Sequence, residues 1–137
     1  MKKFVVYSAI IGSYDNISQP TVIDDRFDYI LFSNDFSEQN IGIWQIRPIK
    51  YHNDIQTKIA RWVKTHPEKL LPEYKCSLWI DANIDINAAD IYKRVIYLYN
   101  NNILISSMVH LKRNCIYDEM ITVLKSKLET EDCILKW

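Results

Sequence analysis

Three oxygen-bearing side chains recur at every second position in the stretch SLWIDANIDI, residues 77–86. They are Asp81, Asn83 and Asp85, and the alternation of a straight strand would place all three on one face. Hard divalent cations prefer oxygen ligands, and an ion that also binds phosphate needs only one or two from the protein. Asp81 and Asn83 can therefore hold Mg²⁺ or Mn²⁺ against a diphosphate. The same residues are also typical of a strand end whose Asp and Asn cap a turn.

The stretch YSAIIGSYDN, residues 7–16, is a second candidate. An apolar strand there runs into Gly12, Ser13 and Tyr14, which predicts a tight turn at the edge of a sheet. Backbone in such a turn can approach a nucleotide base, and the Tyr14 ring can stack on it. The dinucleotide pattern G-x-G-x-x-G is missing, and an ordinary turn after a strand is the favoured explanation of this stretch taken alone.

Basic side chains follow one shoulder of a predicted helix. At 100° per residue, Lys58, Arg61 and Thr65 lie beside its apolar face, and Lys64 lies further round. An ammonium and a guanidinium placed together can grip phosphates. A simple solvated flank is the alternative, because most charged residues are exposed.

The stretch HLKRNCIYDEM, residues 110–120, is the last candidate. His110 ends an expected strand, and Asp118 and Glu119 fall in the first turn of an expected helix. One of these acids can be the general base for an acceptor hydroxyl, and His110 can contact a metal or a phosphate. Acids in a first turn also complement the helix dipole, and Cys115 is expected to be a buried, inert thiol.

Strands and helices alternate along the chain. Strands are predicted for five apolar, β-branched or aromatic runs, at 4–10, 28–34, 42–49, 76–86 and 103–110. Periodic apolar stripes predict three helices, within 53–66, 87–102 and 114–129. We expect Asn53 or Asp54 to cap the first helix, Asn87 the second, and 100–102 to close the second in left-handed geometry. The order predicts a mainly parallel α/β sheet covered on both faces. Ligands then bind beyond the carboxyl ends of the strands, after Ile10, Ser33, Ile80 and His110.

Composition limits the function further. The 137 residues suit one domain, and 17 basic residues balance 17 acidic ones, so general attraction to nucleic acid or membrane is not expected. Three cysteines without a C-x-x-C favour reduced thiols in the cytoplasm. The start, MKKFVVYSAIIGSYD, favours a buried strand over a secretory signal. We expect no integral membrane segment, because no apolar run has membrane-spanning length.

Taken together and in this order, these stretches resemble a glycosyltransferase-like family related to the GT-A nucleotide-sugar transferases. The most specific stretch is H110-L-K-R-N-C-I-Y-D-E119, which is close to the family pattern H-P-x-R-x-C-x-Y-E-E. The other matching pieces are Y7-S-A-I-I-G-S-Y-D15, D28-Y-I-L-F-S-N-D35, K58-I-A-R-W-V-K64 with the following H66-P and L71-P, and W79-I-D-A-N-I-D85. The resemblance covers nearly the whole chain.

The resemblance implies a Rossmann-like GT-A fold, a UDP-sugar or related donor, a hydroxyl acceptor and a divalent cation. It puts the cation at Asp81 and Asn83, with Asp81 as the first metal or ribose contact. It puts the remaining binding and catalytic positions at Ala9, Ile10, Gly12 and Tyr14 around the nucleotide, Arg61 and Lys64 in the donor region, and His110, Arg113, Asp118 and Glu119 on the sugar and acceptor side.

Departures from the family pattern leave alternatives. Leu111 stands where Pro is usual and Asp118 where Glu is usual, and Asn83 replaces the second acid of an Asp-x-Asp pair, which weakens cation binding. Relatives continue well beyond the last motif, so a single domain without its C-terminal acceptor portion is expected.

The first hypothesis is a glycosyltransferase, or its donor-binding part, in surface polysaccharide synthesis. A non-catalytic nucleotide- or partner-binding module is the second. Phosphoryl transfer is the third hypothesis, and the absence of a P-loop sequence from the chain argues against its commonest form.

Overall fold

The computed structural model describes residues 2–12, 16–108 and 115–126. The chain divides into two compact units, Met1–Ile103 and Leu104–Trp137. The first unit is an α/β domain built on one sheet, and the second contains a single described helix. The two units are described separately below.

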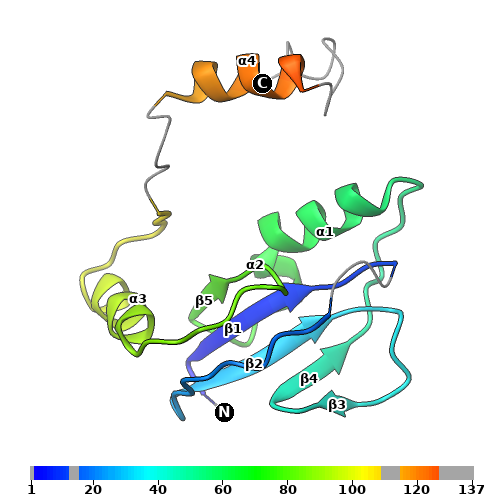
Figure 1. The fold of residues 1–137 in the computed structure, drawn as a ribbon. Helices are drawn as coiled ribbons and strands as arrows, with labels where there is room; N and C mark the ends of the chain where they lie inside the picture. Colours follow the sequence, from blue (N-terminus) through cyan, green and yellow to red (C-terminus); the bar gives the residue numbers. More distant parts are fainter. Residues whose placement is uncertain (1, 13–15, 109–114, 127–137) are drawn as a thin grey trace. The chain divides into compact units, whose positions relative to one another are not determined.

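The first unit contains a mixed, mostly parallel sheet of five strands in the order β3-β4-β2-β1-β5 (Figure 1). Strands β4, β2, β1 and β5 are mutually parallel, and only β3 runs antiparallel, as a hairpin with β4. The predicted α/β class is confirmed, and the antiparallel edge strand is a feature that the sequence did not indicate. The strands are β1 (Phe4–Ala9), β2 (Phe27–Phe32), β3 (Asn40–Ile41), β4 (Trp44–Arg47) and β5 (Cys76–Trp79).

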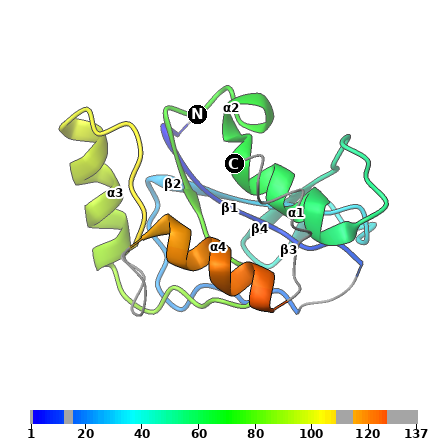
Figure 2. The ribbon, with the colours of Figure 1, turned by 90° about the horizontal axis from the view of Figure 1, so that it is seen from above.

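One face of the sheet is covered by two consecutive helices, α1 (Gln56–Thr65) and α2 (Pro67–Leu70). Both views of the ribbon place α1 across this face (Figures 1 and 2). Alternate residues of β1 and β2 point toward α1 and pack around the fully buried Val63. The buried cluster on this face consists of Val5, Tyr7, Ile30, Phe32, Ile49, Val63 and Leu71.

The opposite face is covered by α3 (Asp90–Asn100) and by two extended segments. Tyr92 of α3 is fully buried against the Phe27 ring, with 5.0 Å between ring centroids. Its hydroxyl accepts a hydrogen bond from the Tyr29 hydroxyl (2.9 Å) and donates one to the Val22 carbonyl (2.7 Å). These buried polar groups are therefore satisfied, and they tie α3 to the sheet.

The strand expected at 76–86 is shorter in the structure, because β5 ends at Trp79. The chain then turns, and the Ile84 amide donates to the Asp81 carbonyl (3.0 Å). Beyond the turn the chain pairs with residues 18–22, whose Ser18 and Val22 amides donate to Ala82 and Ile86. Asp81, Asn83 and Asp85 consequently do not form one straight acidic face.

The helix ends agree with the sequence only in part. Ile55 and Ala89 are the N-cap residues of α1 and α3, and neither supplies a side-chain cap, so the predicted caps are wrong. The predicted left-handed end of α3 is confirmed. Asn102 has φ +56°, its amide donates to the Tyr99 carbonyl, and the Ile103 amide donates to Leu98, which is the Schellman arrangement. The short helix α2 was not predicted, because Pro67 was expected to stop a helix and instead starts one.

In the second unit, residues 104–108 form no strand, in contrast to the prediction for 103–110. Leu104 and Ile105 are 99% and 89% exposed, so their strand propensity finds no neighbouring strand to pack on. The helix α4 (Ile116–Lys125) follows the N-cap residue Cys115. The Cys115 thiol is free and exposed, not buried as predicted.

Among residues 2–12, 16–108 and 115–126, no helix has both the length and the apolarity that a membrane span needs.

Candidate functional site

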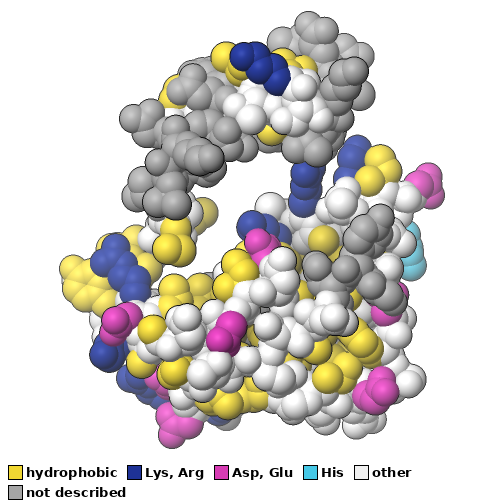
Figure 3. Space-filling view, in the orientation of Figure 1, with side chains coloured by type: hydrophobic (Ala, Val, Ile, Leu, Met, Phe, Trp, Pro, Cys, Tyr) yellow, Lys and Arg dark blue, Asp and Glu magenta, His cyan; other side chains and the backbone are white. Residues whose placement is uncertain are grey.

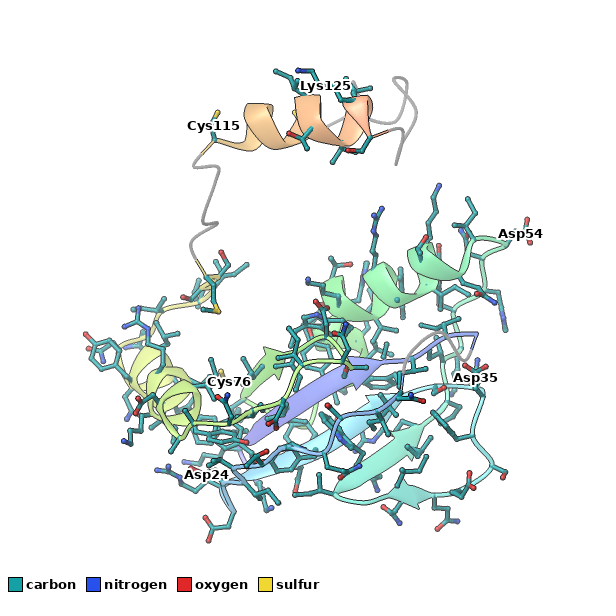
Figure 4. The ribbon with its side chains drawn as sticks, in the orientation of Figure 1. Asp24, Asp35, Asp54, Cys76, Cys115 and Lys125 are labelled. Carbon is teal, nitrogen blue, oxygen red and sulfur yellow. The ribbon has the colours of Figure 1, made fainter. Side chains whose placement is uncertain are left out.

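A pocket of about 460 Å³ opens where β1 ends and α1 begins. Ala9 and Ile10, which the family resemblance puts beside the nucleotide, form its wall on the β1 side. Asp54 at the start of α1 (Figure 4) and the first turns of that helix form the other wall. The full lining consists of Ala9, Ile10, Ile11, Asp54, Ile55, Gln56, Thr57 and Ala60. The pocket therefore lies at the carboxyl end of a parallel strand, where α/β proteins bind ligands.

Gly12 and Gln56 meet at the edge of this pocket. Gly12 has φ +75°, and the side-chain amide of Gln56 occupies the space that a Cβ atom on Gly12 would need. A larger residue at position 12 would face both backbone strain and this clash. The turn after β1 thus requires a glycine, as the sequence indicated, although Tyr14 lies outside the described residues.

Asp81 follows β5 on the neighbouring strand, and its side chain is exposed. The Ile80 amide donates to the Tyr7 carbonyl (3.1 Å), so Asp81 comes directly after the last rung of the β1–β5 ladder. Its Oδ1 atom accepts a hydrogen bond from the Trp79 indole Nε1 (2.9 Å). Asp81 is therefore an accessible carboxylate at the carboxyl edge, held by one neighbour.

Lys64 reaches the same place from α1. Its Nζ atom lies 5.6 Å from the centre of the Trp79 ring, within the range of a cation–π interaction. The Tyr7 hydroxyl donates to the Lys64 carbonyl (2.8 Å), and burial raises the pKa of Tyr7 to about 12. Tyr7 thus stays neutral and links the end of α1 to the centre of the sheet.

The pocket and the Asp81 carboxylate both border α1, although Asp81 is not among the residues that line the pocket. Ala60 of α1 lines the pocket, and Lys64 of α1 contacts Trp79, which binds Asp81. Lys64 lies one helical turn after Ala60, on the same side of α1. Arg61 is exposed on the same helix. The structure thus puts Ala9 and Ile10 in the pocket, and it connects Lys64 to Asp81 through the Trp79 side chain.

The donor set fits a cation that shares its ligands with a phosphate. Asp81 offers Oδ2, which accepts no hydrogen bond from the described residues, and Asn83 is exposed two residues later. Asp85 is engaged elsewhere, since its carboxylate accepts hydrogen bonds from the Thr21 amide and hydroxyl (both 2.7 Å). Within the described ranges, no group of three or more His, Cys, Asp or Glu side chains is placed to bind a metal alone. Asp81 and Asn83 suit an ion that phosphate oxygens also hold.

The predicted acceptor-side residues lie in the second unit. His110 and Arg113 are outside the described residues. Asp118 and Glu119 belong to the first turn of α4, and their roles remain predictions.

A second pocket, of about 360 Å³, lies at the amino ends of the strands and was not predicted. Its lining includes Asp24, which Figure 4 shows at the end of the sheet away from Asp54. Asp24 pairs with Arg26, whose hydrogen bond lowers the pKa of Asp24. Asp28 pairs with Lys2 (3.3 Å) and accepts a hydrogen bond from the Tyr74 hydroxyl (2.9 Å). No motif marks this pocket in the sequence, because its residues come from four separate segments.

Apart from the two pockets, the surface over α3 carries exposed apolar side chains. Figure 3 shows apolar side chains at the surface over α3, where Tyr97 is 54% exposed. The Arg94 guanidinium lies over the Tyr97 ring, 5.5 Å from its centre. This ring is therefore partly covered by its own helix.

The fold and the site define a class of protein: an α/β domain with a pocket and an exposed carboxylate at the carboxyl ends of parallel strands, where α/β proteins bind ligands. The family model of the TOD1/MUCI70 glycosyltransferase-like domain matches residues 1–135, and the chain belongs to this family. This membership indicates a role related to glycosyl transfer, with a sugar donor in general as the ligand. Neither the curated proteins nor the solved structures include a significant match.

Proposed function

We propose that this chain is the donor-binding part of a GT-A-type glycosyltransferase that uses a nucleoside-diphosphate sugar, most simply a UDP-sugar. The family match over residues 1–135 carries this proposal. The pocket of about 460 Å³ is of a size that suits a small ligand, and it lies where the family resemblance puts Ala9, Ile10 and Gly12 beside the nucleotide.

The diphosphate is proposed to lie toward Lys64 and Asp81. A Lys64 ammonium can neutralise phosphate oxygens, and Arg61 is the second basic side chain on this part of α1. Asp81 and Asn83 would hold Mn²⁺ or Mg²⁺. When bound, such an ion supplies positive charge that stabilises the departing diphosphate. Asp118 or Glu119 is proposed as the base that accepts the proton of the acceptor hydroxyl. Surface polysaccharide is the proposed product class.

Direct binding tests the donor site. Calorimetry of the full chain with UDP and Mn²⁺ is expected to show binding, which Ala60→Phe should weaken because the larger side chain fills the pocket. Ala88→Phe is the matched control, since Ala88 is exposed and outside the pocket. Equal UDP affinity of the two variants would place the nucleotide elsewhere.

Turnover separates this proposal from a second one, a non-catalytic nucleotide-binding module. Asn83 favours the second, because a neutral amide replaces the second acid of an Asp-x-Asp pair. Release of sugar from a UDP-sugar series in the presence of Mn²⁺ would support the transferase. UDP binding without any sugar release would support the binding module.

A further inference from the structure

Trp79 contacts three parts of the proposed donor site at once. Its indole Nε1 donates to Asp81 Oδ1 (2.9 Å), and the face of its ring carries the Lys64 ammonium at 5.6 Å. Its ring also packs edge-on against Tyr7, with 5.2 Å between centroids and 73° between planes. The residue that precedes the acid by two positions is thus the one described side chain in contact with both Lys64 and Asp81.

We propose that Trp79 is a positioning residue, which fixes the Asp81 carboxylate and the Lys64 ammonium around a cation-bound diphosphate. This inference rests on the proposed function, because it assumes that a nucleoside diphosphate binds here. It assigns a role to an aromatic side chain that the sequence motifs leave without one.

The indole hydrogen bond gives Asp81 one preferred orientation. An indole N–H can only donate, and the bond to a carboxylate is charge-assisted. With Oδ1 engaged, Oδ2 is the oxygen that remains for a cation. Hydrogen bonds of this kind to a ligating carboxylate are known to tune metal affinity.

The Trp79 ring is held in place by Tyr7 of the neighbouring strand β1. Tyr7 is 2% exposed, and its hydroxyl is bound to the Lys64 carbonyl. Tyr7, Trp79 and Lys64 therefore form a closed set of contacts between β1, β5 and α1. The rigid Trp79 ring therefore positions two groups, the Lys64 ammonium over its face and the Asp81 carboxylate at its edge.

Replacement by phenylalanine separates positioning from packing. Trp79→Phe keeps an aromatic ring beside Tyr7 and Lys64 and removes the N–H donor. UDP affinity in the presence of Mn²⁺ is expected to fall about tenfold, and affinity without Mn²⁺ should change much less. Trp62→Phe is the matched control, because it makes the same substitution in α1, at a ring that is stacked between Tyr51 and His66.

The outcomes separate the two proposals. If wild-type protein binds UDP and Trp79→Phe binds it equally well with Mn²⁺, the positioning role is wrong and the donor site stands. If wild-type protein binds no UDP with Mn²⁺, the donor site and the positioning role both fall.

If Trp79→Phe does not fold, the Trp79 indole N–H resonance provides a test in which the Trp79 side chain is retained. With UDP present, substoichiometric Mn²⁺ should broaden the indole N–H resonance of Trp79 before those of Trp44 and Trp62. Without Mn²⁺, Asp81→Asn should shift the Trp79 indole resonance. Broadening that does not single out Trp79, or an unshifted resonance in Asp81→Asn, would overturn the inference.

Discussion

Acidic side chains gather at both ends of the sheet, and they are used differently. At the amino end, Asp24 is paired with Arg26, and Asp28 is paired with Lys2 and bound by Tyr74. At the carboxyl end, Asp81 is exposed and accepts one hydrogen bond from the described part of the chain, donated by Trp79. The comparison teaches that a carboxylate's partners, more than its presence beside a pocket, indicate whether it is available for a ligand.

The largest effect expected from this comparison is on cation-dependent binding. Asp81→Asn should weaken UDP binding in Mn²⁺ by at least about a hundredfold, because a neutral amide replaces the carboxylate that is proposed to bind the cation. Asp28→Asn should leave UDP affinity unchanged. Calorimetry of both variants checks the contrast, and a comparable loss in Asp28→Asn would remove the distinction between the two ends.

The next effect concerns stability at the amino end. Tyr92→Phe removes the hydroxyl that holds Val22 and Tyr29, whose own hydroxyl accepts from the Asp24 amide (3.0 Å). The free energy of unfolding should fall by about 1–3 kcal/mol, while UDP affinity stays near the wild-type value. Urea denaturation and calorimetry measure the two quantities. An unchanged unfolding midpoint would show that water replaces the lost hydroxyl at no cost.

A smaller effect is expected at Lys64. Lys64→Met keeps an apolar stem over the Trp79 ring and removes the charge, so UDP affinity should fall about three- to tenfold. The loss should shrink as salt rises, because exposed charges are screened. Lys69→Met, on α2, is the control. A loss that does not depend on salt would argue against a phosphate contact.

The smallest expected effect is the pH dependence from Asp85. Its hydrogen bonds to the Thr21 hydroxyl and amide lower the pKa of Asp85 in the folded state. Its contribution to stability is therefore present above the ordinary Asp pKa of about 3.9 and is lost as the pH falls through the lower folded value. The gap in unfolding temperature between wild type and Asp85→Asn should narrow over that range. A difference in unfolding temperature that stays constant with pH would show that the charge of Asp85 does not contribute to stability.

The sequence predicted the centre of the domain well. The runs that contain Val5 and Ile30 became buried strands, and the stripe that contains Val63 became a buried helix face. Local periodicity is sufficient for these elements, because the pattern of burial is written in neighbouring residues. The left-handed end at Asn102 was predicted for the same local reason.

The candidate site was predicted less completely. Gly12 and Asp81 were singled out from their places after predicted strands, whereas Ala9 and Ile10 were assigned to the nucleotide by the family resemblance, and these roles stay predictions. The bond from Trp79 to Asp81 spans only two residues, and the sequence left it out because residue spacing does not fix side-chain rotamers. The sequence also could not show that Asp85 binds Thr21, which lies 64 residues away, because such a contact depends on tertiary packing. The strand expected to continue past Trp79 failed for the same reason, since pairing with residues 18–22 redirects the chain.

The hairpin of β3 and β4 has a consequence for the behaviour of the protein at high concentration. The outer side of β4 would otherwise offer unpaired amides and carbonyls to another molecule. The two residues of β3 occupy that side, and the tight turn at Gly42 is covered by the Gln19 side chain. An edge strand as short as this one discourages strand-to-strand association between molecules. Lengthening β3, or replacing Gly42, is therefore expected to promote aggregation.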